Sequence, residues 1–234
     1  MFKRFWFNRL RRRRERFPRL LSIELCSMCN ASCIMCPHDQ MQRPKQPMPL
    51  DLLARIVHQC QGQPLQKLNL FWMGESFCHR QLLDALRLVR RDLPDVRLYI
   101  STNAGLLDEV HSRAIIDEDL LDVINFDIDG ITKETYQEVR HRVDFDVVMR
   151  NIGYFLDYKR RQRRRTPQTR VTIIRMPETE AEIDRFVAHW RPQVDRVEVN
   201  DYNTLLGSQE DRNLGEVAVR SQQGSFDFAC RHPW

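Results

Sequence analysis

Four of the seven cysteines in this 234-residue chain lie within eleven residues, and the other three are scattered. The four are Cys26, Cys29, Cys33 and Cys36. Because the cysteine count is odd and no secretory signal is recognisable, a disulfide framework is not expected. Clustered thiols in a reducing compartment are typical metal ligands. The sequence therefore predicts a metal or iron–sulfur site in this segment.

The spacing of the four cysteines discriminates between kinds of site. Two C-x2-C pairs of a zinc site are normally about 15–20 residues apart, whereas three residues separate Cys29 from Cys33. A ferredoxin-type run, C-x2-C-x2-C-x3-C-P, has its three-residue gap after the third cysteine rather than the second. The third interpretation takes Cys29-x3-Cys33-x2-Cys36 as the unit and leaves Cys26 outside it.

A scaffold of alternating strands and helices is predicted around these cysteines. Strand-type apolar runs occupy 20–25, 68–72, 96–101, 122–128, 170–176 and 196–200, and helix-period stretches occupy 49–61, 79–91, 106–114 and, as a split stretch, 133–159. A capping box at Thr179 and Glu182 predicts the start of a last helix. Right-handed crossovers between such units give a parallel sheet with helices outside it.

Polar residues follow the strands at the ends where sites are built in such folds. Gly74 and Glu75 follow the second strand, and Asn103 follows the third. Asp127 and Asp129 follow the fourth. Each feature alone is ordinary turn or helix-start chemistry. Together with the cysteine loop they place every unusual cluster at one edge of the predicted sheet.

This combination resembles the radical S-adenosylmethionine (radical SAM) enzymes over residues 20–234. Their C-x3-C-x2-C signature matches Cys29, Cys33 and Cys36. The resemblance implies that these thiolates bind three irons of a [4Fe-4S] cluster and that S-adenosylmethionine chelates the fourth iron. A fourth thiolate would block that iron, so we expect Cys26 to be a packing thiol. The implied fold is a partial (β/α)6 TIM-like barrel.

The strand-end residues match further elements of the family. Gly74 and Glu75 are similar to the end of Gly-Gly-Glu-Pro, although Met73 and Ser76 replace the first glycine and the proline. The resemblance implies that Gly74, Glu75, Asn103, Asp127 and Asp129 bind S-adenosylmethionine. Asp127 stands where serine is commoner. Three further residues match the pattern that follows, namely Tyr136, Arg140 and Asn151.

The implied activity is reductive cleavage of S-adenosylmethionine. This reaction yields a 5′-deoxyadenosyl radical that abstracts hydrogen from a substrate, which the sequence leaves open as a peptide, a sugar or a small metabolite. The resemblance also implies a flavodoxin- or ferredoxin-like electron donor. Two alternatives stay open, a non-catalytic iron–sulfur or zinc-binding module and a serine hydrolase. The second rests on Gly74–Cys78, which partly mimics a G-x-S-x-G elbow with Ser76 as nucleophile.

Three segments are expected: a basic arm at 1–19, a barrel at 20–207 and a tail at 208–234. The first 20 residues hold nine Lys or Arg against one acid, which suits at most a weak contact with an anionic membrane surface, and no specific nucleic acid partner is expected. The tail, with Cys230, resembles the start of the cysteine-rich SPASM module of many radical SAM enzymes, cut short. No apolar run approaches 18 residues, so we expect a cytoplasmic protein.

Overall fold

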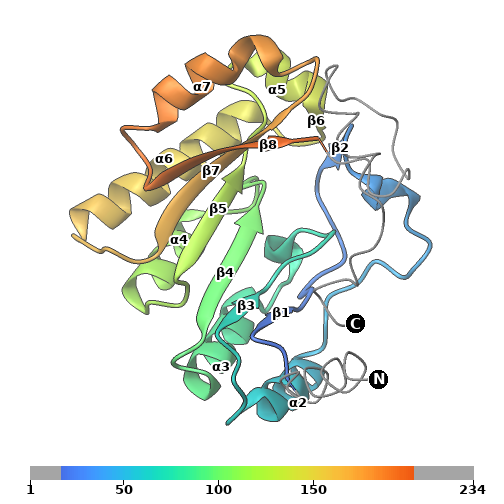
Figure 1. The fold of residues 1–234 in the computed structure, drawn as a ribbon, viewed down its shortest axis with the longest axis vertical. Coiled ribbons are helices and arrows are strands. Elements are labelled where there is room, and N and C mark those ends of the chain that lie inside the picture. Colours follow the sequence, from blue (N-terminus) through green and yellow to red (C-terminus); the bar gives the residue numbers. More distant parts are fainter. Residues whose placement is uncertain (1–16, 203–234) are drawn as a thin grey trace, which may run out of the picture.

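A curved sheet of six parallel strands forms the centre of the computed structural model, which describes residues 17–202 (Figure 1). Its order is β1-β3-β4-β5-β7-β8, so β1 and β8 are the two unpaired edges. The strands are β1 (Leu20–Ser22), β3 (Lys67–Asn69), β4 (Arg97–Thr102), β5 (Val123–Asp127), β7 (Gln168–Arg175) and β8 (Arg196–Asp201). The partial (β/α)6 barrel expected from the sequence is confirmed.

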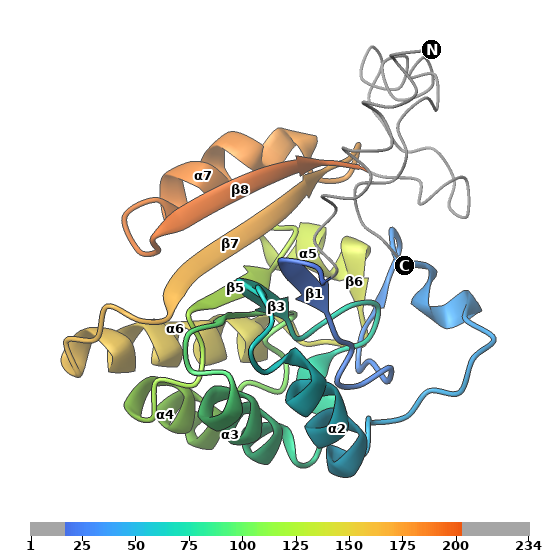
Figure 2. The same ribbon diagram turned by 60° about the horizontal axis from the view of Figure 1, so that its bottom comes forward.

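Helices follow the strands and cover the outside of the curve (Figure 2). They are α2 (Leu50–Cys60), α3 (Leu82–Asp92), α4 (Glu109–Asp117), α5 (Lys133–Val139), α6 (Phe145–Arg161) and α7 (Ile183–Trp190). Short 3-10 turns occupy η1 (Pro37–Gln40), η2 (Ser76–Cys78) and η3 (Glu180–Glu182). The predicted split between residues 133 and 159 is confirmed, because β6 (Arg140–His141) interrupts the helix and pairs with β2 (Ser32–Cys33).

The main apolar core lies between the sheet and these helices. Successive side chains of a strand point to opposite faces, and in β4 and β5 the buried apolar residues are Leu98, Ile100, Ile124 and Phe126. The residues that alternate with them along β4, Tyr99 and Ser101, carry hydroxyl groups and are half-buried. The helices thus receive the apolar face of the sheet, and its concave face is left polar.

Two local expectations are wrong. The first strand ends at Ser22 rather than residue 25, because the chain then turns to carry Glu24 toward a neighbouring loop. The predicted capping box does not form: Thr179 Oγ1 donates to the Ile174 carbonyl oxygen at 2.6 Å. Glu182 instead accepts from the main-chain nitrogen and the hydroxyl of Thr132. A tertiary contact with the start of α5 has displaced the local one.

Within residues 17–202, no helix is long and apolar enough to cross a membrane. The basic arm lies almost entirely outside the described residues, and so does the tail with its likeness to a SPASM start.

Candidate functional site

A cavity of about 350 Å³ opens at the carboxyl ends of β3, β4 and β5, and the cysteine loop forms one of its walls. Cys29, Cys33 and Cys36 all line it. Cys26 does not line the cavity: it is 1% exposed and forms a β-bridge with Pro47. The loop therefore presents the three predicted ligands and packs the fourth thiol inside.

Internal hydrogen bonds hold the cysteine loop in shape. Ser27 Oγ donates to the Gln46 carbonyl oxygen at 3.0 Å and accepts from the Gln46 main-chain nitrogen at 2.8 Å. The buried His38 donates through Nε2 to the Ser27 carbonyl oxygen at 2.9 Å. These bonds tie Ser27 to the segment that follows the cysteines, so the loop that carries the three thiols is closed on itself.

Burial disfavours the thiolate form of all three cysteines, and a nearby positive charge would favour it. Burial raises the pKa of Cys29 to about 12 and that of Cys33 to about 11, and it also raises the pKa of Cys36. A bound metal offsets such a penalty and releases the thiol protons. Within residues 17–202, no three His, Cys, Asp or Glu converge on one point as a single metal ion requires. The three thiols line one cavity, and a cluster in which each thiol binds a different iron would not require them to meet at one point.

A second loop, Met73–Glu75, closes against the cysteine loop. A Cβ atom at Gly74 would lie 2.2 Å from the Cys26 carbonyl oxygen, so only glycine fits this approach. The Glu75 main-chain nitrogen donates to the Met28 carbonyl oxygen at 2.7 Å. Glycine is thus required here by contact with the cysteine loop, even though the glycine expected before it is Met73.

Glu24, which the sequence analysis did not identify, binds the main chain of the Met73–Glu75 loop through its carboxylate. Its Oε1 accepts from the main-chain nitrogens of Met73 at 2.9 Å and Gly74 at 3.0 Å. Its Oε2 pairs with Arg43 at 2.5 Å, and these partners lower its pKa although burial opposes them. A lone acid two residues before Cys26 carries no motif that would have identified this role.

Glu75 joins the ends of two strands. Its carboxylate is 4% exposed and accepts from Thr102 Oγ1 at 2.9 Å, the Asn103 main-chain nitrogen at 2.9 Å and the Phe77 main-chain nitrogen at 3.0 Å. Burial raises its pKa against those bonds. Glu75 and Asn103 both line the cavity. Asn103 Nδ2 donates to Asn30 Oδ1 at 2.9 Å, so its amide connects the cavity floor to the cysteine loop.

Asp127 lines the cavity from β5. It accepts from Ser101 Oγ at 2.6 Å and from Asn125 Nδ2 at 2.7 Å. Burial nevertheless raises its pKa to about 6. A carboxylate held at such a cost beside a cavity is typical of a binding residue.

The free-energy cost of burying the Asp127 carboxylate predicts that Asp127→Asn changes stability in a pH-dependent way. Since the folded pKa of about 6 exceeds the ordinary value, Asp127 favours folding at low pH and this contribution is lost as pH rises through 6. In cluster-free protein, the variant should gain about 1.4 kcal/mol of unfolding free energy over wild type between pH 5 and pH 7.5. Urea unfolding at both pH values measures this gain. A difference between the two proteins that does not change with pH would contradict the assignment.

Asp129 lies apart from the other predicted contacts, since it does not line the cavity. It is 1% exposed and forms a buried ion pair with Arg140, whose Nε lies 3.0 Å from Asp129 Oδ2. Its Oδ1 accepts from the Ile174 main-chain nitrogen at 2.6 Å. Arg140 itself lines the cavity and donates to Cys33 Sγ at 3.6 Å. Asp129 therefore orients Arg140, and direct contact between Asp129 and the cofactor stays a prediction.

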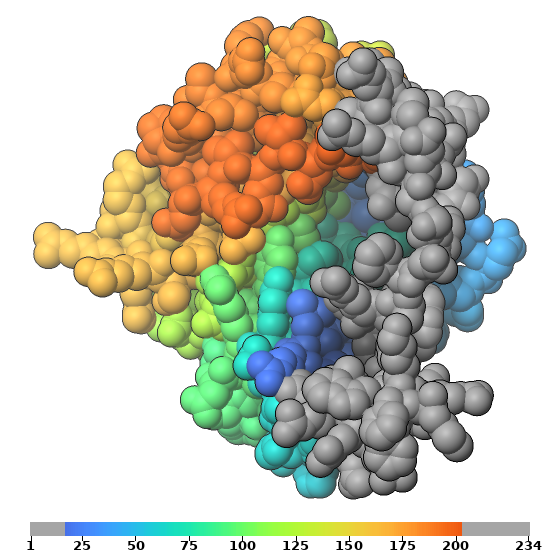
Figure 3. All heavy atoms as spheres, viewed as in Figure 1, coloured from blue at the N-terminus to red at the C-terminus, as the bar shows by residue number. Residues whose placement is uncertain are grey.

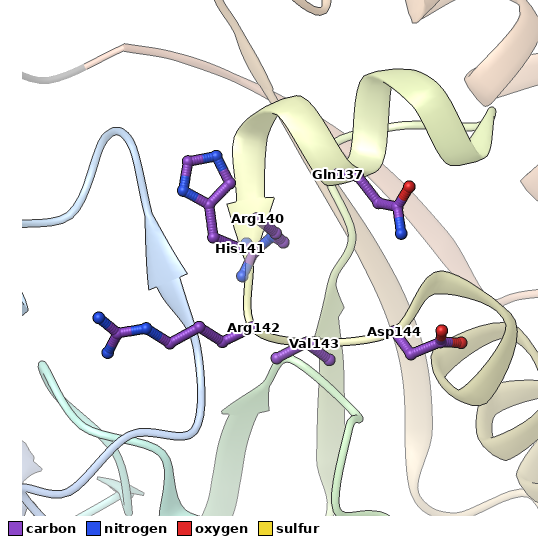
Figure 4. Close-up of a pocket in the computed structure, with 6 residues that line it drawn as sticks. All are labelled: Gln137, Arg140, His141, Arg142, Val143 and Asp144. Atoms are coloured by element: carbon purple, nitrogen blue, oxygen red, sulfur yellow. The ribbon is translucent and has the colours of Figure 1, made fainter.

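Arg140 also borders a second cavity, of about 430 Å³, at the turn after β6 (Figure 4). No thiol and no carboxylate of the predicted site reaches it, and the residues that line it are Gln137, Arg140, His141, Arg142, Val143 and Asp144. The predicted cluster ligands and the predicted cofactor contacts Glu75, Asn103 and Asp127 line the first cavity instead, and Arg140 lines both cavities.

The serine that the hydrolase alternative requires is not presented to a substrate. Ser76 is 1% exposed, does not line the cavity and donates to the Leu70 carbonyl oxygen at 2.7 Å. The structure therefore gives this alternative no nucleophile.

The sequence profile of the radical SAM superfamily matches residues 23–189. The chain belongs to the radical SAM superfamily. Radical SAM proteins are enzymes that use a [4Fe-4S] cluster and S-adenosylmethionine, so the two cofactors expected from the sequence are those of its family. No curated protein sequence matches the chain.

Solved structures share the fold at low identity. SuiB of Streptococcus suis bound to S-adenosylmethionine is 16% identical, with a TM-score of 0.73 over 94% of this chain and 49% of that one. SuiB bound to its precursor peptide SuiA is also 16% identical, with a TM-score of 0.71 over 93% of this chain and 47% of that one. The enzyme anSMEcpe with bound AdoMet is 17% identical, with a TM-score of 0.64 over 79% of this chain and 51% of that one. The chain thus spans about half the length of these radical SAM structures, and the likeness shows the fold alone.

Proposed function

We propose that this chain binds one [4Fe-4S] cluster through Cys29, Cys33 and Cys36 and uses it to cleave S-adenosylmethionine reductively. The observation that carries the proposal is that three half-buried thiols, none of them in a disulfide, line one cavity at the carboxyl ends of the barrel strands. When bound, the cluster supplies one electron that breaks a carbon–sulfur bond of S-adenosylmethionine, and the resulting 5′-deoxyadenosyl radical takes hydrogen from a substrate.

The residues of the cavity bind and orient in this proposal. Asp127 and Asn103 supply acceptors for a cationic, hydroxyl-rich cofactor, and the guanidinium of Arg140 supplies donors for its carboxylate. Glu75 is nearly saturated by protein donors, so its role is to hold the ends of β3 and β4 together beneath the cofactor. Packing of Met73–Glu75 against the cysteine loop excludes water from the reacting atoms, which protects reactive intermediates.

A peptide is the substrate class to test first, ahead of sugars and small metabolites. SuiB, which shares the fold, is bound to a precursor peptide, and anSMEcpe has been solved with peptides. An electron donor of flavodoxin or ferredoxin type belongs to the same proposal, because the cluster needs a source of low-potential electrons.

Anaerobic reconstitution with iron and sulfide, followed by assay for 5′-deoxyadenosine, tests the proposed function. We expect 5′-deoxyadenosine to form from S-adenosylmethionine when dithionite is added, with iron and sulfide near four each per chain. A Cys29→Ala preparation treated in the same way is the control and should form none. Product formation that is independent of iron, or protein that holds zinc and no iron after reconstitution, would contradict the proposal.

A further inference from the structure

The concave face of the sheet carries a group of charged side chains that the cofactors do not explain. Lys67, Arg97, Arg170 and Arg196 each occupy a strand position facing away from the helices, and Glu198 faces them from β8. We call these five residues the basic cluster. Among residues 17–202, the edge strands β1 and β8 do not pair with each other, so the sheet does not close into a full barrel. Figure 3 shows the molecule from the same side as Figure 1.

An aromatic ring organises the basic cluster. The Lys67 ammonium lies 4.4 Å from the ring centroid of Tyr99, and the Arg170 guanidinium carbon lies 5.7 Å from the same centroid. Such distances are those of cation–π contacts. Phe71, which lines the cofactor cavity, packs edge-on against Tyr99 with a centroid separation of 5.1 Å. The two cations are therefore held in place, and their support is continuous with the cofactor cavity.

Positive charge in the basic cluster exceeds negative charge. Glu198 is the single acid, and it is shared by Arg170 at 3.1 Å and Arg196 at 2.9 Å. Arg97 bonds the neutral Gln168 at 2.6 Å. The Lys67 ammonium has no hydrogen-bond or ion-pair partner among residues 17–202. Partial burial lowers the pKa of Lys67, and the nearby Arg170 and Arg97 lower it further, whereas Glu198 opposes them.

The basic cluster lies on the same face as the cofactor cavity but toward the amino ends of the strands. Lys67 and Arg97 begin β3 and β4, four residues before Phe71 and Ser101 of the cavity lining. Ser101 lines the cavity and stands two residues after Tyr99 on β4, a rise of about 7 Å. Arg170 is in register with Asn125, whose amide donates to Asp127 in the cavity wall. An anion held beside Tyr99 would thus lie about 7 Å along β4 from the cavity wall, and the rest of the same molecule would extend toward the cofactor.

We propose that the basic cluster binds an anionic group of the substrate, a carboxylate or a phosphate, and orients that substrate toward the cofactor cavity. The proposal rests on the proposed function, because it takes the cavity to be where hydrogen is abstracted. A lysine and an arginine held at one aromatic ring suit an oxyanion, since the guanidinium fork donates to two oxygens at once. The single acid, Glu198, holds Arg170 and Arg196 in position until the anion enters.

Calorimetric titration of the reconstituted protein with inorganic phosphate, and separately with acetate, tests this site. S-Adenosylmethionine is kept saturating so that the cofactor's own carboxylate subsite is filled, and ionic strength is held constant with chloride. We expect saturable binding of at least one anion. Lys67→Met/Arg170→Gln should weaken that binding at least tenfold. Preference for phosphate or for acetate would identify which oxyanion the substrate carries.

Two further variants make the test decisive. Arg55→Gln/Arg160→Gln removes two exposed positive charges from α2 and α6, and should bind the anion as wild type does. Glu198→Gln frees both of its arginines and should tighten binding, a result that a misfolded protein cannot give. Wild type that binds neither anion, or a Lys67/Arg170 variant that binds as tightly as the control pair, would overturn the proposal.

Failure of the proposed function would be seen separately. Iron content and 5′-deoxyadenosine formation are measured on the same wild-type preparation, and neither readout depends on phosphate or acetate. Cleavage of S-adenosylmethionine without anion binding would refute the basic-cluster proposal alone.

Discussion

Alanine at Cys29, Cys33 or Cys36 is expected to remove the iron–sulfur cluster from the protein. Each of these thiols lines the same cavity, and each would bind a different iron, so no neighbouring thiol can take over. Loss of one ligand should reduce iron and sulfide to background and abolish the electron paramagnetic resonance signal of the reduced protein. Formation of 5′-deoxyadenosine should fall at least a thousandfold.

Cys26→Ala and Cys60→Ala are the matched controls for the three ligand variants. Both thiols are buried, at 1% and 3% exposure, and neither lines the cavity. Each variant should keep a full cluster and lose only packing, which costs about 1 kcal/mol for a small buried side chain. A Cys26 variant without the cluster, paired with a Cys29 variant that retains it, would refute the ligand assignment.

Gly74→Ala is expected to have the second largest effect. The added Cβ would meet three main-chain atoms, the Cys26 oxygen at 2.2 Å and two Ser27 atoms at 2.7 Å. Main-chain atoms cannot rotate away as a side chain does, so the Met73–Glu75 loop must move off the cysteine loop. We expect a loss of about 1–3 kcal/mol in unfolding free energy and at least a tenfold loss of S-adenosylmethionine affinity, measured by urea unfolding and calorimetry.

Gly153→Ala provides the control for Gly74→Ala. Gly153 lies within α6, and its added Cβ would meet nothing within 4 Å. Alanine in a helix interior should stabilise the protein by about 0.5–1 kcal/mol and leave cofactor affinity unchanged. Equal behaviour of the two variants would show that the close approach at Gly74 is unimportant.

The order of strands and helices was predictable because it depends on local periodicity. Each predicted strand is present, and the register of parallel strands then brings their carboxyl ends to one edge. The sequence therefore predicts the cysteine loop, Glu75, Asn103 and Asp127 at one edge of the sheet, which is where the cavity lies. Their individual roles as cofactor contacts stay predictions.

Contacts between distant residues were not predictable from the same patterns. Glu182 fitted a capping box, but donors of Ile131 and Thr132 compete for its carboxylate in the folded chain. Glu24 stabilises a loop about 50 residues away, and nothing in its own neighbourhood indicates this. Local sequence specifies which hydrogen bonds are possible, whereas the packed structure determines which partner is nearer.

The basic cluster is an intermediate case. Alternation of polar and apolar residues is visible at 67–69, 97–101 and 170–173, and it predicts that Lys67 and Arg170 share one face of the sheet. Their meeting at Tyr99 depends on the curvature of the sheet, which brings β3 and β7 toward each other across its concave side. The sequence periodicity predicts which face of the sheet a side chain occupies. How far apart two side chains on that face lie is known only from the structure.

Electron paramagnetic resonance of the reduced, reconstituted protein, recorded with and without S-adenosylmethionine, tests the central claim most directly. Three cysteine ligands leave one iron open to the cofactor, so the account predicts one [4Fe-4S] signal per chain that changes shape when S-adenosylmethionine is added. Cys26→Ala should give the same pair of spectra. A cluster signal that S-adenosylmethionine leaves unchanged would contradict the account.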